Sequence, residues 1–251
     1  MVNNDNKTDK EDYDPRRRKF LKNSGIAAGG VVGGGLLVGL FGDTFEGEEK
    51  SEDTNTDYND SRQFFKRKED FDVISAATER IFPEEEMGPG AIELGVPYYI
   101  DRQLAGAWGV NANEYMSGPF FEGEVNQGYQ TRMKRNELFM AGIQAIKETS
   151  DKKYEENFYD LEEEKQDEIL KLLENDEIDI PGANSSLFFE QLIEATLEGA
   201  YCDPAYGGNK NMAGWKMKEY PGVQMNYTEE ELINDDFKKI KPKPLREYQN
   251  S

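Results

Sequence analysis

From Phe64 onward, the apolar residues of this chain recur at the three- and four-residue spacing of an α-helix. No segment alternates apolar with polar residues as a half-buried strand would, and no repeat of constant period is present. A chain patterned in this way buries its apolar residues by packing helix against helix. We therefore expect an all-α fold of about five or six helices, with a long structured loop near the C-terminus.

Five helices are expected where apolar positions cluster. Pro83 ends the first, Pro97 suits the first position of the second, and residues 109–128 are rich in Gly, Asn and Pro and predict a loop. In chain order, the apolar positions are Phe71, Ile74, Ala77 and Ile81; Ile100, Leu104 and Trp108; Met133, Phe139, Met140, Ile143 and Ile146; Ile169, Leu170, Leu172 and Leu173; and Phe188, Phe189, Leu192, Ile193, Thr196 and Leu197.

The starts of the last two helices have candidate caps. Asp160 with Glu163 three residues on resembles a capping box, and Ser185 or Ser186 would cap the fifth helix. The aromatic residues in that helix are more often core than part of a cofactor site. We expect the fifth helix to end near Leu197, before the long loop.

Near the N-terminus, a basic stretch precedes an apolar one. Residues 15–22 hold five positive charges and no acid, and the 17 residues 25–41 are uncharged and include seven glycines. A basic region followed by a short apolar region is the layout of an export signal. The alternative is a membrane anchor whose orientation the positive charges set, although 17 residues is the short limit for a span.

The basic stretch resembles the twin-arginine consensus: Arg17 and Arg18 are followed, after one residue, by Phe20, Leu21 and Lys22. The resemblance implies recognition by the twin-arginine translocase, which exports folded proteins. We expect the protein at the extracytoplasmic face of the cytoplasmic membrane, or in the periplasm or cell wall. No Ala-x-Ala-like site follows, so cleavage stays open, and residues 1–42 are either a signal or, if uncleaved, an N-terminal membrane anchor.

The rest of the chain divides by composition. Residues 43–62 hold eight acids and few apolar residues, which predicts a solvated acidic linker. Residues 63–227 form the expected helical domain, and residues 228–251 a C-terminal tail. Aromatic residues make up 12% of the chain, too many for a disordered protein.

Charge and residue types exclude several function classes. The formal net charge of −21 opposes binding to nucleic acid. The chain has no His and only one Cys, Cys202, so catalysis by Ser–His–Asp or Cys–His groups is excluded. The same lack of His and of further Cys excludes an iron–sulfur cluster, a structural zinc site and covalent haem within this chain. We predict no catalytic residue and no metal site.

The loop after the fifth helix has turn-forming and aromatic residues side by side. Asp-Pro starts a turn, Gly-Gly-Asn tolerates positive φ, and the aromatic rings supply contact area. Two readings carry equal weight: the rings cap the helical core, or they bind a partner through Trp215 as anchor. Cys202 is either a buried thiol or one that pairs with a partner cysteine. The candidate partner-binding residues are Asp203, Pro204, Tyr206, Gly207, Gly208, Asn209, Trp215 and Tyr220.

From about Phe71 to Gly222, the chain resembles the small subunit, called subunit 3 or gamma, of membrane-bound gluconate 2-dehydrogenase and related flavin sugar dehydrogenases. It departs from the family pattern at Lys210-Asn211-Met212, where an acidic residue is common. The resemblance is carried by Ile81-Phe82-Pro83, Gly88-Pro89-Gly90-Ala91, Phe188-Phe189 with Leu192, Thr196 and Gly199, Asp203-Pro204-Ala205-Tyr206-Gly207-Gly208-Asn209, Gly214-Trp215 and Tyr220-Pro221-Gly222.

The resemblance implies a non-catalytic subunit that binds no flavin or haem. A large flavoprotein of the glucose-methanol-choline type would carry FAD and oxidise the sugar or sugar acid, and a cytochrome c subunit would hold haem. The small subunit would support folding and export of the large one. The alternatives are a free-standing cell-envelope binding protein without a flavoprotein partner and a carboxylate-dependent hydrolase. No acid–base spacing selects the latter.

Overall fold

The structure is a computed structural model that describes residues 61–121, 129, 131–227 and 240–249. All of them belong to Thr56–Ser251, the second of two units into which the chain divides. The predicted signal over 1–42 and nearly all of the predicted linker over 43–62 lie outside the described residues. Among the helices that are described, none is long and apolar enough to cross a bilayer.

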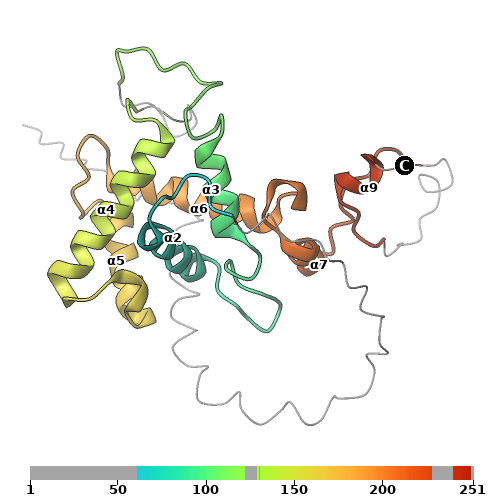
Figure 1. Cartoon of the computed structure of the whole chain (residues 1–251), viewed down its shortest axis with the longest axis horizontal. Coiled ribbons are helices and arrows are strands. Elements are labelled where there is room, and N and C mark those ends of the chain that lie inside the picture. Colours follow the sequence, from blue (N-terminus) through green and yellow to red (C-terminus); the bar gives the residue numbers. More distant parts are fainter. Residues whose placement is uncertain (1–60, 122–128, 130, 228–239, 250–251) are drawn as a thin grey trace, which may run out of the picture. The chain divides into compact units, whose positions relative to one another are not determined.

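The prediction of an all-α fold is confirmed, since the described residues form helices and turns with only isolated β-bridges (Figure 1). The 3₁₀ turns in the described part of the chain are η4 (Phe158–Asp160), η5 (Pro204–Tyr206) and η6 (Lys210–Met212). The α-helices are α2 (Lys68–Ile81), α3 (Val96–Ala105), α4 (Arg135–Tyr154), α5 (Glu163–Glu174), α6 (Ser185–Tyr201), α7 (Ala213–Met217) and α9 (Leu245–Gln249).

Helix α6 lies at the centre of the packing, in contact with α2, α3, α4, α5 and α7 (Figure 1). Its Phe188 ring meets the Phe139 ring of α4 edge to face, with centroids 5.5 Å apart, and both side chains are fully buried. Burying an aromatic ring of this size contributes about 1.5–3 kcal/mol relative to exposing it. The apolar stripe predicted for the fifth helix therefore forms the core, except that Ile193 is half-buried and Leu197 is 44% exposed.

Two buried carboxylates tie the helices together. Asp167 of α5 accepts two hydrogen bonds from the Arg80 guanidinium of α2, at 2.8 and 3.1 Å. Asp101 of α3 accepts the backbone N–H groups of Phe64 and Phe65 at 3.1 and 2.8 Å, which holds the start of the domain against α3. Removing Arg80 would leave the Asp167 carboxylate buried without its ion-pair partner, which costs more than the pair contributes.

Two helix boundaries differ from the prediction. Helix α3 ends at Ala105, so Trp108 lies in the following turn, where the Gly109 N–H donates to the Gln103 carbonyl. Helix α4 begins at Arg135, two residues after Met133, because the Glu137 carboxylate accepts the Lys134 N–H at 3.0 Å and closes the N-terminus there.

The two predicted N-caps are also wrong. Asp160 lies in turn η4, and α5 begins only at Glu163. The residue at the N-cap position of α6 is Asn184, not Ser185 or Ser186. The Ser186 N–H in the first turn of α6 donates to the Asp176 carboxylate of the preceding connection at 3.2 Å. A cap supplied from another element cannot be found in the local sequence pattern.

Candidate functional site

The C-terminal loop (residues 202–223) begins where α6 ends, at Tyr201, four residues later than the sequence predicted. Its centre is Asn209, which has no exposed surface and a left-handed backbone with φ of 47°. The Asn209 amide donates to the Cys202 carbonyl and accepts the Gly214 N–H, both at 2.8 Å. One buried side chain thus joins the start of the loop to its short helix α7.

Two glycines let the loop lie against the end of α6. A Cβ atom on Gly208 would meet the Gly199 carbonyl oxygen at 2.1 Å, and one on Gly214 would meet the Ala200 carbonyl oxygen at 2.0 Å. Both obstacles are backbone atoms, which cannot move aside as a flexible side chain could. The Gly residues of the family motif therefore serve the fit of loop to helix.

The aromatic residues of the loop divide into buried and exposed ones. Trp215 is 4% exposed, donates its indole N–H to the Tyr201 carbonyl at 2.7 Å, and packs edge to face on Tyr220. Tyr206 and Tyr220 are 55% and 49% exposed. Trp215 therefore packs within the chain, whereas Tyr206 and Tyr220 offer surface to a partner.

The last described segment, residues 240–249, lies across this loop and is here called the C-terminal strap. Asp203 binds it directly: one carboxylate oxygen accepts the Leu245 N–H at 2.7 Å, while the other accepts the Ala205 N–H. The Val223 N–H donates to the Lys243 carbonyl at 2.9 Å. The prediction of a C-terminal tail over 228–251 did not include this contact.

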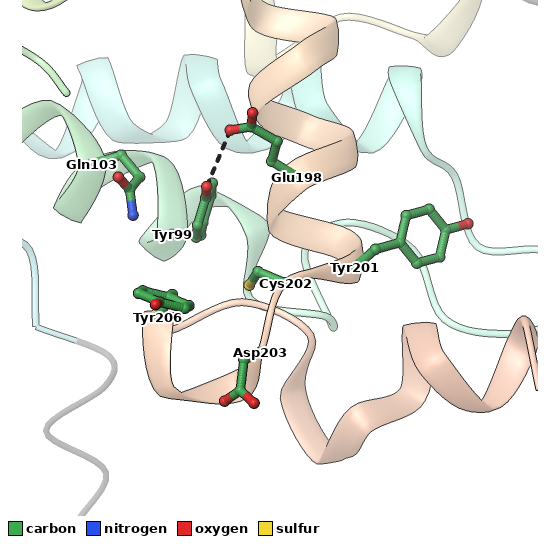
Figure 2. Close-up of a pocket in the computed structure, with 7 residues that line it drawn as sticks. All are labelled: Tyr99, Gln103, Glu198, Tyr201, Cys202, Asp203 and Tyr206. Carbon is green, nitrogen blue, oxygen red and sulfur yellow. Dashed lines mark hydrogen bonds between the residues drawn. The ribbon is translucent and has the colours of Figure 1, made fainter. Parts of the chain in front are cut away.

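An open hollow of about 450 Å³ lies between α3, the end of α6 and the turn η5. Figure 2 shows Tyr99 of α3 facing Glu198 of α6, with Cys202 below them and Tyr206 across the opening. The Tyr99 hydroxyl donates to Glu198 at 3.1 Å. The lining residues are Tyr99, Gln103, Glu198, Tyr201, Cys202, Asp203 and Tyr206.

Two side chains that line the hollow, Cys202 and Tyr99, have raised pKa values. Burial raises the pKa of the Cys202 thiol to about 11, with the Asp203 carboxylate adding to the effect. Burial and then the Glu198 carboxylate also raise the pKa of Tyr99. Near neutral pH the thiol is protonated, and a protonated thiol is a poor nucleophile.

Sequence reasoning found part of this site and missed part. Asp203 and Tyr206 were among the candidate residues and line the hollow, whereas Tyr99, Gln103 and Glu198 were not predicted. Tyr99 and Glu198 are 99 positions apart, so only the packing of α3 on α6 brings them together. No local spacing could have indicated the pair.

The remaining candidate residues have the following positions. Gly207, with φ of 97°, follows turn η5, which begins at Pro204. The targeting residues Arg17, Arg18, Phe20, Leu21 and Lys22 lie outside the described residues. Within the described part of the chain, no group of three or more Cys, Asp or Glu side chains is placed to hold a metal ion.

Comparison with known proteins gives one match. Residues 68–222 match the family model described as Gluconate 2-dehydrogenase subunit 3. No curated protein and no solved structure matches the chain. The match begins at α2 and ends at Gly222, so it includes the C-terminal loop except its last residue, Val223, and leaves out the C-terminal strap.

Proposed function

The chain belongs to the gluconate 2-dehydrogenase subunit 3 family, and from this premise we propose that it is the non-catalytic small subunit of an exported, flavin-dependent gluconate or sugar dehydrogenase. A large flavoprotein of the glucose-methanol-choline type would bind FAD and carry out the oxidation. A cytochrome c subunit with haem would accept the electrons. The small subunit supports the folding and export of the large one. The observation that carries the proposal is the family match over residues 68–222.

The chemistry of the hollow supports a binding role over a catalytic one. Its thiol is neutral near pH 7, and the Tyr99 hydroxyl is engaged with Glu198. General acid–base catalysis works best with a pKa near the operating pH, and the raised values of Cys202 and Tyr99 lie far from it. The chain also has no His to act as a base.

The exposed side of the C-terminal loop supports a partner-binding role. Tyr206 and Tyr220 present about half of their surface on a loop that is fixed internally by Asn209 and Trp215. Tyr is enriched among the residues that dominate binding energy, and a pre-ordered loop loses little entropy on binding. We therefore place the flavoprotein contact on this loop, with Tyr206 and Tyr220 as its accessible aromatic residues.

Export by the twin-arginine route is part of the proposal. A flavoprotein folds around FAD before it leaves the cytoplasm, and a route for folded cargo fits that requirement. The resemblance of residues 17–22 to the twin-arginine consensus supports a signal on the small chain that serves both subunits. If the signal is not cleaved, the N-terminal segment also anchors the complex to the membrane.

The test is co-purification. The full-length chain carrying an affinity tag is isolated from cells that also produce the flavoprotein, and we expect a flavin-bearing large chain and dehydrogenase activity with it. The chain produced alone should have no flavin absorbance and no activity. Stoichiometric FAD on the isolated chain, or no large chain in the wild-type preparation, would contradict the proposal.

Export is tested with the double variant Arg17→Lys and Arg18→Lys. Lys keeps the positive charge but not the planar guanidinium, so both subunits should stay in the cytoplasm. The matched control is Arg16→Lys, which leaves the pair intact. Undiminished export of the double variant would indicate the general secretory route or simple anchoring.

A further inference from the structure

The connection between α3 and α4, here called the α3–α4 loop (residues 106–134), was predicted in part as an ordinary Gly-, Asn- and Pro-rich loop. Its described residues form no helix, and in Figure 1 they run beyond the ends of α3 and α4. Most connections in compact domains are about 4–6 residues long, and much longer ones are usually functional or disordered. The described residues decide between these two cases.

Both ends of the loop are fixed to the helical domain. The Asn136 N–H of α4 donates to the Gly109 carbonyl at 2.9 Å, and the Arg135 N–H donates to the Asn111 side-chain oxygen at 2.8 Å. Asn111 is 3% exposed and has a left-handed backbone with φ of 53°. The early part of the loop is therefore held against the first turn of α4.

The Arg135 side chain completes this closure. Its guanidinium carbon lies 4.9 Å from the centre of the Trp108 ring and 4.6 Å from the centre of the Tyr129 ring, which places a cation against two aromatic faces. The guanidinium also donates to Glu114 within the loop and to Gln191 of α6. Arg135 is 9% exposed, so the base of the loop is part of the core.

The tip of the loop, residues 115–121, has the opposite character. Tyr115 is 85% exposed and Phe121 is 74% exposed. The seven residues Tyr-Met-Ser-Gly-Pro-Phe-Phe contain no charged group, in a chain where 32% of residues are charged. An uncharged aromatic tip on a fixed base has the character of a docking element, because exposed contiguous apolar surface usually marks a binding site.

Charge indicates what covers the tip. The formal net charge of −21 opposes close association of two copies of this chain. Between Gln103 and Thr131 the sequence has three carboxylates and no Lys or Arg, which opposes insertion of the tip into an anionic lipid surface. An apolar groove on another protein satisfies both conditions.

Area indicates that the tip acts together with another contact. Aromatic side chains bury about 150–250 Å² each, while a standard interface buries about 800 Å² on each partner. Tyr115 and Phe121 alone therefore supply roughly half of one side of an interface. The rest must come from a second surface, such as the C-terminal loop.

We propose that residues 115–121 form a second docking surface, which inserts Tyr115 and Phe121 into an apolar groove of the flavin-bearing large chain. The proposal rests on the proposed function for the identity of the partner, and it uses a surface separate from the C-terminal loop. The Arg135, Trp108 and Tyr129 contacts fix the base from which the tip extends. Docking through two surfaces would fix the orientation of the large chain on the small one.

The test uses the full-length tagged chain and the double variant Tyr115→Ser and Phe121→Ser. Both side chains are exposed, so the variant should unfold at the same denaturant concentration as the wild type. The purified FAD-bearing large chain should bind the variant at least about tenfold more weakly. The matched control is Leu197→Ser, which removes an exposed apolar side chain from α6 and should bind as the wild type does.

Three results would contradict the docking surface. If the wild type captures the FAD-bearing chain and the double variant binds it equally well, the docking surface is wrong and the proposed function stands. If the wild type captures no FAD-bearing chain, both the docking surface and the proposed function are wrong. Binding to phosphatidylglycerol vesicles, or a dimer, that is present in the wild type and lost in the double variant would assign the tip to lipid or to a second copy, and would also overturn the inference.

Discussion

The C-terminal loop and the α3–α4 loop place their aromatic residues in opposite ways. The first buries Trp215 and orders itself around Asn209, with two glycines pressed against α6. The second fixes only its base, through Arg135, and leaves Tyr115 and Phe121 almost fully exposed. The loop with the most specific family motif is thus the one whose motif residues mainly contact their own chain.

The contrast separates a recognisable sequence from an accessible surface. A motif such as Asp-Pro-Ala-Tyr-Gly-Gly-Asn is specific because each position has a geometric requirement, and those requirements are met inside the molecule. A binding tip needs only exposed apolar area and an ordered base, which many sequences supply. Substitutions in the two loops should therefore have different effects on stability.

The largest effect on stability is expected from Trp215→Ala. The indole is 4% exposed and its N–H is bonded to Tyr201, so the variant should lose about 3–5 kcal/mol of unfolding free energy. Urea unfolding followed by circular dichroism measures the loss. Tyr206→Ala, at a residue that is 55% exposed, is the control and should change stability by less than about 0.5 kcal/mol. A small loss for Trp215→Ala would mean that the loop is not part of the core.

The next largest loss of stability is expected from replacing a glycine of the C-terminal loop. In Gly208→Ala the new Cβ would meet the Gly199 carbonyl oxygen at 2.1 Å, and we expect a loss of about 1–3 kcal/mol. Gly106→Ala, in the other loop, would place its Cβ 3.4 Å from the Arg102 carbonyl oxygen, an ordinary contact, and should change little. Thermal unfolding of both variants tests this. Equal shifts would remove the distinction between the two loops.

A pH dependence follows from Cys202. Its pKa is about 11 in the folded chain against 9.0 for an ordinary thiol, so the folded state holds the proton more tightly. The stabilisation is present below pH 9 and is lost as pH rises through 11, amounting to roughly 2–3 kcal/mol. The difference in unfolding free energy between wild type and Cys202→Ala, measured from pH 8 to pH 11, should shrink over that window. A constant difference would mean that the thiol is open to solvent.

The smallest stability effect is expected at the tip of the α3–α4 loop. Tyr115→Ser and Phe121→Ser should each change the unfolding free energy by less than about 0.5 kcal/mol, because neither side chain is packed. Chemical denaturation of the single variants checks this. A loss near that of Trp215→Ala would show that the tip packs on the domain, and would make the two loops alike.

The sequence was sufficient for the fold class because helical spacing is a local property. Apolar positions such as Ile143 and Leu192 are buried as predicted. Prediction from the sequence failed for contacts between residues that are far apart in the chain. Asp176 caps α6 from the preceding connection, and Glu198 accepts a hydrogen bond from a tyrosine of α3. The helical spacing also placed Trp108 in the second helix, whereas Trp108 lies in the turn after α3 and packs against Phe139. Exposure of Tyr115 and burial of Trp215 depend on packing, which spacing does not encode.

The C-terminal strap has a consequence for the order of events during synthesis. Gly222, with φ of 75°, leaves room for the Lys243 backbone, and Asp203 receives the Leu245 N–H. Leu245 follows Asp203 by 42 residues in the chain, so these partners are synthesised after helices α2 to α7. The loop therefore acquires its final contacts after the helices have had time to form. A nascent chain that has not reached Lys243 lacks these contacts, so the closed loop marks a domain to which the C-terminal strap has been added.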